Sequence, residues 1–232
     1  MSIVNRKFPI MAQPPDDANN KTLVISYLTL RKAIGLLGFF LPLILWMGVW
    51  MFDHSTVARP SISDYYYTHM RNSFVGILCA VSLFLYAYNG YDAVDRITGY
   101  IGSILALGVA FFPTTPGHPD AYDILIGRFH LGFAGLFFCT LIFFSLFLFT
   151  RTHPNQQMTE RKKMRNTVYY ISGFIMLGCV LAIALYELFG PASQSNTESG
   201  SFVFWCESIA LMSFGVSWLV KGEIILKDIN HH

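Results

Sequence analysis

Six long apolar segments, separated by short polar or turn-forming stretches, dominate this 232-residue sequence. Each segment is close to the roughly 20 residues that an α-helix needs to cross a bilayer. A soluble helical protein would instead need a polar stripe along most of its helices, and these segments lack one. Charged residues make up only 13% of the chain, about half the share of a typical globular domain. The sequence therefore predicts an all-α, polytopic membrane protein, a bundle of six transmembrane helices. The expected spans are residues 33–52, 72–88, 97–112, 128–149, 168–189 and 202–220.

The placement of lysine and arginine predicts the orientation. If the chain crosses six times, all of its 16 Lys and Arg residues except Arg59, Arg71 and Arg128 fall on the side of the two termini. Cytoplasmic segments carry the excess of these residues, so both termini are expected in the cytoplasm and the protein in the plasma (inner) membrane. The basic residues between Arg151 and Arg165 are expected to face anionic lipid and not nucleic acid. The resulting division is a cytoplasmic amino-terminal tail (1–32), the bundle (33–220) and a cytoplasmic carboxy-terminal tail (221–232).

Small residues and one pair of acids have structural interpretations. The pairs Gly35 with Gly38, Gly99 with Gly102 and Gly132 with Gly135 are expected to let neighbouring helices approach closely. Asp92 and Asp95 are expected to cap the third helix and to pair with Lys221 or Arg96.

Unusual polar residues gather on the opposite, non-cytoplasmic side of the predicted bundle. We expect them to line an outer-leaflet pocket that binds the headgroups of membrane lipids, with Arg71 or Arg128 as the phosphate partner because the planar guanidinium matches phosphate oxygens. The competing interpretation is structural, with Glu207 in a buried ion pair with Arg71 or Arg128. The candidate headgroup-binding residues are Ser63, Asp64, His69, Arg71, His118, Arg128, His130 and Glu207.

The loop of residues 60–68 is the most distinctive on that side. Its three consecutive tyrosines, Tyr65–Tyr67, suit an interfacial belt where an apolar ring meets a wet hydroxyl. Ser61, Ser63 and Asp64 are placed to cap a helix that begins near Tyr65. The functional alternative makes the loop a lid or headgroup-binding rim, with Asp64 as a base or ligand.

An enzyme is the second hypothesis. Asp64, His130 and Glu207 are candidate catalytic groups of a hydrolase or an acyl or headgroup transferase, provided that they converge within hydrogen-bond reach. His69, His118 and His130 are candidate zinc ligands, although no pair has the i, i+4 spacing of a helical metal site. A serine nucleophile is not predicted, because no Gly-x-Ser-x-Gly elbow occurs. A transporter or channel ranks last, since the middles of the spans are apolar.

Short motifs in chain order also carry a family resemblance. They are Ile62-Ser63-Asp64 after the first span, Phe112-Pro113 after the third, His130 with Gly132 and Ala134 in the fourth, and Trp205-Cys206-Glu207 in the sixth. With these motifs the chain resembles the Frag1/DRAM/Sfk1-like six-span membrane proteins and their uncharacterised bacterial relatives. The resemblance implies a lipid-related role, with Ser63, Asp64, His130 and Glu207 as an outer-face cluster.

Overall fold

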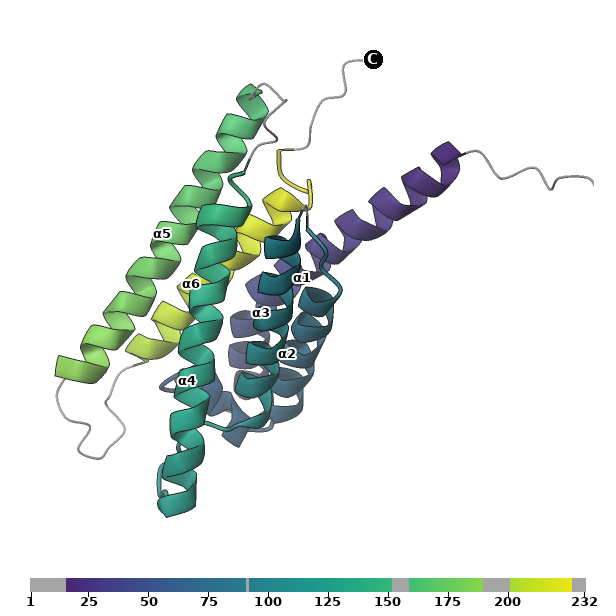
Figure 1. The fold of residues 1–232 in the computed structure, drawn as a ribbon. Helices are drawn as coiled ribbons and strands as arrows, with labels where there is room; N and C mark the ends of the chain where they lie inside the picture. The colour runs from purple at the N-terminus through teal and green to yellow at the C-terminus, as the bar shows by residue number, and fades with distance from the viewer. Residues whose placement is uncertain (1–15, 91, 152–158, 190–200, 227–232) are drawn as a thin grey trace, which may run out of the picture.

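The chain is helical, without strands, in the part that the computed structural model describes: residues 16–90, 92–151, 159–189 and 201–226. Five helices, counting α4 together with η2, are long and apolar enough to cross a membrane, and α2 is shorter. The predicted all-helical membrane architecture is confirmed at this level. The α-helices are α1 Asp16–Phe52, α2 Arg71–Tyr86, α3 Ala93–Phe111, α4 Ala121–Phe143, α5 Glu160–Phe189 and α6 Phe202–Lys221, with a 3-10 helix η1 at Ser63–Tyr67 and a π-helix η2 at Phe144–Leu148 (Figure 1).

Three helices, α1, α4 and α5, begin about two turns or more before their predicted apolar segments. Helix α1 starts at Asp16 because the sequence up to Gly35 contains no proline or glycine, so much of the expected tail 1–32 is helical. Helix α4 starts after Asp120, whose carboxylate accepts a 2.7 Å hydrogen bond from the Asp123 backbone N–H, while Asp123 accepts from Asp120 in return. Helix α5 starts at Glu160, in charged turns. A run of apolar residues marks only the apolar part of a helix. A prediction based on such runs therefore misses polar helix ends like these.

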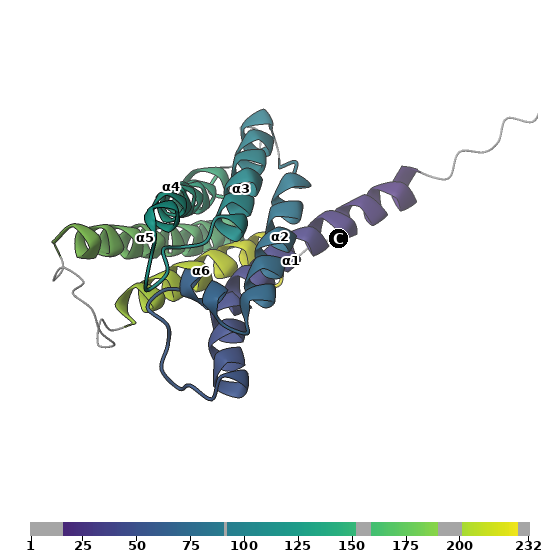
Figure 2. The same ribbon diagram turned by 90° about the horizontal axis from the view of Figure 1, so that it is seen from below.

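The six helices pack as a closed ring. Each of α2 to α5 contacts the helices before and after it in the chain, and α6 contacts both α5 and α1, which closes the ring. Helix α1 begins and α6 ends at the same end of the bundle (Figure 1), which we call the termini end. The segment between α1 and α2 lies at the other end, the loop end. The first turns of α1 project beyond the other helices (Figures 1 and 2).

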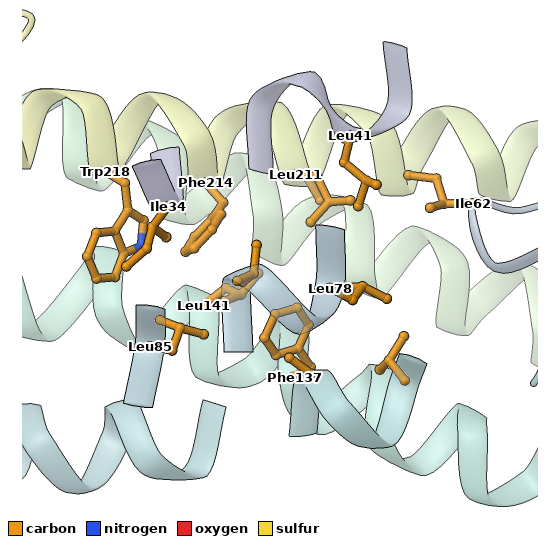
Figure 3. Close-up of a cluster of buried hydrophobic side chains, with 14 of the residues drawn as sticks. Ile34, Leu41, Ile62, Leu78, Leu85, Phe137, Leu141, Leu211, Phe214 and Trp218 are labelled. Carbon is orange, nitrogen blue, oxygen red and sulfur yellow. The ribbon is translucent and has the colours of Figure 1, made fainter. Parts of the chain in front are cut away.

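Aromatic side chains fill the ring at the termini end. The fully buried Trp218 packs edge-on against Tyr88, Phe144, Phe149 and Phe214, with ring centroids 4.9 to 5.9 Å apart. Edge-to-face pairs add to the packing energy beyond the area they bury. The core continues from Trp218 towards Ile62 at the loop end (Figure 3), so the loop itself contributes to the core.

The glycine pairs behave differently from one another. A Cβ atom at Gly35 or Gly38 would collide with α6, and one at Gly99 would lie 2.6 Å from a backbone carbonyl oxygen of α2. Close helix packing is confirmed at these positions. It is wrong for Gly132 and Gly135, which face open space on the outside of α4.

The acidic pair at the start of α3 caps the helix as expected. The Asp92 side chain accepts a 3.0 Å hydrogen bond from the backbone N–H of Asp95, and this bond holds the pKa of the Asp92 carboxyl below its usual range. The expected partner of Asp92 was wrong: its carboxylate pairs with Arg151 at 2.7 Å, not with Lys221 or Arg96. Arg151 follows η2 and reaches α3 because α4 packs beside it.

Candidate functional site

The loop before η1 is attached to the first turns of α6. The Phe204 backbone N–H donates to the Pro60 carbonyl oxygen at 2.9 Å. The Ile62 backbone N–H donates to the Glu207 carboxylate at 2.7 Å, while the Ile62 side chain is buried beside the core of Figure 3. The Glu207 carboxylate is thus bound by a backbone amide, and the expected ion pair with Arg71 or Arg128 is not formed. Glu207 fixes the position of the loop relative to the bundle.

Asp64 and Ser61 close the loop on itself. The Asp64 carboxylate accepts hydrogen bonds from the Ser61 backbone N–H at 2.9 Å and the Ser61 hydroxyl at 2.8 Å. The Asp64 backbone N–H donates to the same hydroxyl at 3.2 Å. These reciprocal hydrogen bonds are those of a capping box, but they overlap the start of the short 3-10 helix η1, which contains Asp64, and no α-helix begins near Tyr65. Burial raises the pKa of the Asp64 carboxyl, and the Ser61 hydrogen bonds partly offset that effect.

The three tyrosines do not share one environment. Tyr65 is fully buried and packs against Phe204, with ring centroids 5.7 Å apart, so the expectation of an interfacial belt is wrong for this residue. Tyr66 is half-buried and lies against Arg71. Tyr67 is exposed and donates to the Thr114 carbonyl oxygen at 2.5 Å. Burial raises the pKa of both Tyr65 and Tyr67.

His130 joins the loop to α3 and α4. Its Nδ1 lies 2.6 Å from the Phe112 carbonyl oxygen, and its Nε2 lies 2.8 Å from the Ser63 hydroxyl oxygen. His130 and Ser63 are both buried, at 4% and 7% exposed. The Phe112 carbonyl is available because Pro113 ends α3, and the carbonyls at a helix end have no partner within the helix. Three segments of the chain therefore meet at His130 and Ser63: η1, the end of α3 and α4.

A small cavity lies directly beside this group. Its volume is ≈ 30 Å³, room for about two water molecules or a few atoms of a ligand. Ser63 and Glu207 are its polar wall residues. The remaining wall residues are apolar: Leu41, Ile62, Phe74, Leu78, Val109, Ala134, Phe137, Phe138 and Leu211. Such a site offers an apolar slot with a few polar groups at one side, the usual composition of a small-molecule pocket.

The fold brings together half of the predicted headgroup-binding residues. Ser63, Asp64, His130 and Glu207 converge through the contacts above, and each is at least half-buried. The other four lie outside this group.

His69 is exposed and pairs with Asp53. Arg71 donates to the Tyr66 hydroxyl and stacks on its ring, with the guanidinium carbon 4.1 Å from the ring centroid. His118 and Arg128 are exposed near the start of α4. Within the described ranges, no group of three His, Cys, Asp or Glu side chains is arranged to hold a metal ion, so His69, His118 and His130 do not form a zinc site there.

Sequence reasoning missed the backbone groups that organise the site. The Phe112 carbonyl and the Ile62 N–H have no residue-type signal, although Pro113 marks the carbonyl that is left without a helical partner. The Ser61-Ile62-Ser63-Asp64 pattern is a readable capping-box signal.

No protein-family model, no curated protein and no solved structure matches this chain.

Proposed function

We propose that this protein is an integral membrane protein of lipid-related function, which binds a lipid at the loop end of the bundle. The observation that carries the proposal is the cavity that Ser63 and Glu207 share with apolar side chains. The apolar wall would contact the part of the lipid's hydrocarbon chain that adjoins the headgroup linkage. A hydroxyl or amide of a lipid at that boundary could donate a hydrogen bond to the Glu207 carboxylate in the cavity wall, because an ionised carboxylate accepts hydrogen bonds.

The membrane placement in this proposal has six spans and both termini in the cytoplasm of the plasma (inner) membrane. The distribution of Lys and Arg supports it. Helix α2 has 16 residues, about 24 Å at 1.5 Å per residue. It therefore spans a hydrocarbon core of about 30 Å only if the bilayer thins or its polar ends lie at the interface. The cavity then lies towards the outer leaflet, and the exposed residues His69, Arg71, His118 and Arg128 would face the lipid headgroups on that side.

In this proposal, the role of Arg71 and Arg128 differs from the one predicted from the sequence. Arg71 lies against Tyr66 and Arg128 is exposed on α4, so a lipid phosphate would meet them only at the exposed surface.

Filling the cavity tests the proposal. Ala134 lines the cavity, so Ala134→Leu places a larger side chain in the space that the lipid would occupy. We expect cross-linking of a photoactivatable phospholipid to the purified protein in nanodiscs to fall at least about 10-fold, equivalent to about 1.4 kcal/mol of binding.

The matched control is Gly135→Leu, one position along α4, where the added side chain meets open space. Cross-linking of this variant should equal that of the wild type. Equal cross-linking of the Ala134→Leu variant, with its melting temperature unchanged, would contradict lipid binding in the cavity.

A further inference from the structure

The contacts of His130 assign the position of its proton. A carbonyl oxygen only accepts hydrogen bonds, so the 2.6 Å contact with the Phe112 oxygen requires that Nδ1 carry the hydrogen in the neutral ring. Nε2 is then the unprotonated nitrogen. The 2.8 Å contact with Ser63 must consequently be a hydrogen bond donated by the serine hydroxyl to the imidazole. This is the arrangement of a nucleophilic serine and its general base, with a third group orienting the base.

From this geometry we propose that Ser63 is a nucleophile that takes the acyl group from a fatty-acid ester, with His130 as its general base. The inference rests on the proposed lipid-binding function. It differs from the expectation drawn from the missing nucleophile elbow, because here a 3-10 helix positions the serine instead of a strand-to-helix turn.

Other buried serines of the bundle show the contrast. The Ser82 hydroxyl donates to the Ser103 carbonyl, and the Ser145 hydroxyl donates to the Ser217 hydroxyl. These bonds join different helical segments through groups that do not take up a proton near neutral pH. Ser63 instead donates to an imidazole, the side chain most often used as a base. Ser63 also lines the cavity, which has room for a few atoms of a ligand.

The cavity indicates the class of substrate. Its wall is apolar except at Ser63 and Glu207. An ester with hydrocarbon on its acyl side would place its first chain carbons in the apolar slot and its carbonyl carbon at the polar side. In a glycerolipid the ester linkage lies at the boundary between chains and headgroup, which is where the loop end of a membrane-spanning bundle meets the bilayer.

The reaction balances with water as the second reactant. The Ser63 oxygen forms a bond to the ester carbonyl carbon while its proton passes to His130 Nε2. The bond from that carbon to the alcohol oxygen then breaks, and the departing alcohol takes the proton from His130, which leaves an acyl-serine. Water then attacks the carbonyl carbon of the acyl-serine while His130 Nε2 accepts one of its protons. The bond from that carbon to the Ser63 oxygen breaks and His130 returns the proton to this oxygen, which releases the fatty acid and restores the Ser63 hydroxyl. An acceptor alcohol in place of water would make the second half a transfer.

Neighbouring groups support these steps by orienting His130 and Ser63. The Phe112 carbonyl holds His130 in the tautomer that the reaction needs. Asp64 interacts electrostatically with His130, and its carboxylate would stabilise the imidazolium that forms when His130 accepts the proton. Glu207 acts as a positioning residue, because its bond to the Ile62 amide fixes the backbone next to Ser63.

An alkyl fluorophosphonate, which forms a covalent phosphonyl ester with an activated serine and releases fluoride, tests the inference. The full-length protein in nanodiscs should form an adduct that peptide mass spectrometry locates at Ser63. Ser63→Ala should abolish the adduct, and His130→Gln should slow its formation by about 100-fold or more, the usual contribution of a general base. Vesicles of a phospholipid with a labelled acyl chain should release free fatty acid with the wild type and not with Ser63→Ala.

Ser208→Ala is the matched control, since Ser208 is a buried serine of α6 outside the cavity wall, and it should label at the wild-type rate. Photo-cross-linking of phospholipid to the wild-type protein separates the two proposals, because binding in the cavity does not require an activated serine. Wild-type protein that binds phospholipid but forms no adduct at Ser63 would overturn the nucleophile and leave the proposed function standing. Wild-type protein that neither binds nor reacts would overturn both.

Discussion

Replacing Trp218 by alanine should destabilise the protein more than any substitution in the loop or at Glu207. The side chain is fully buried among Tyr88, Phe144, Phe149 and Phe214 at the termini end. Lipid tails are as apolar as a protein core, so the loss in a membrane comes mainly from broken packing and from the cavity left behind. We expect the free energy of unfolding to fall by about 3–5 kcal/mol, measured by denaturant titration in mixed micelles.

A tryptophan on the outside of the ring provides the control. Trp50 on α1 is 54% exposed, and lipid or detergent can replace the contacts that Trp50→Ala removes. That variant should unfold within about 0.5 kcal/mol of the wild type. Equal losses for the two variants would show that the aromatic cluster does not hold the ring together.

The second large effect is expected from Glu207→Ala. This change leaves the Ile62 amide without its acceptor next to a buried side chain, and an unsatisfied buried donor costs about 1–3 kcal/mol. Because the same bond fixes the loop to α6, hydrogen exchange in peptides covering residues 60–67 should become faster. Glu207→Gln keeps an acceptor oxygen and should lose less than half as much stability.

Glu187, an exposed acid near the end of α5, is the matched control. Glu187→Ala should change neither the unfolding free energy nor the exchange of the loop. Unchanged loop exchange in Glu207→Ala would refute the anchoring role of this carboxylate.

A pH dependence follows from Asp64. Burial raises the pKa of its carboxyl above the usual value, so the folded protein holds this proton more tightly than the unfolded chain. Its contribution to stability is therefore fully present below the unfolded pKa and is lost as the pH rises through the folded pKa. Melting temperatures measured from about pH 4 to pH 7 should fall more for the wild type than for Asp64→Asn. A parallel fall in both proteins would remove Asp64 as the cause.

Tertiary structure explains why the sequence predicted some site residues and not others. His130 and Glu207 stood out because polar side chains near the end of an apolar span are costly unless they find partners, and Asp64 stood out in the distinctive loop of residues 60–68. His69 and His118 were predicted because they are histidines on the same side as His130. They lie in loops, however, where no sequence pattern predicts the direction in which a side chain points. Ser63 was foreseen only as a cap or headgroup contact. Its pairing with His130 depends on the place where a loop after the first helix meets the fourth helix.

The sequence by itself determined the all-helical membrane architecture and, within a few turns, where its helices lie. Both follow from local rules: the length of an apolar run, the helix-ending effect of proline and the capping by acidic residues. Only the tertiary structure decided that the helices close into a ring, that Tyr65 is buried and that Glu207 binds a backbone amide instead of an arginine. These outcomes depend on which segments, far apart in the chain, satisfy each other's buried polar groups. The pattern of apolar residues does not predict which of these groups will pair, because the backbone C=O group, and the N–H group of every residue except proline, is alike at each position.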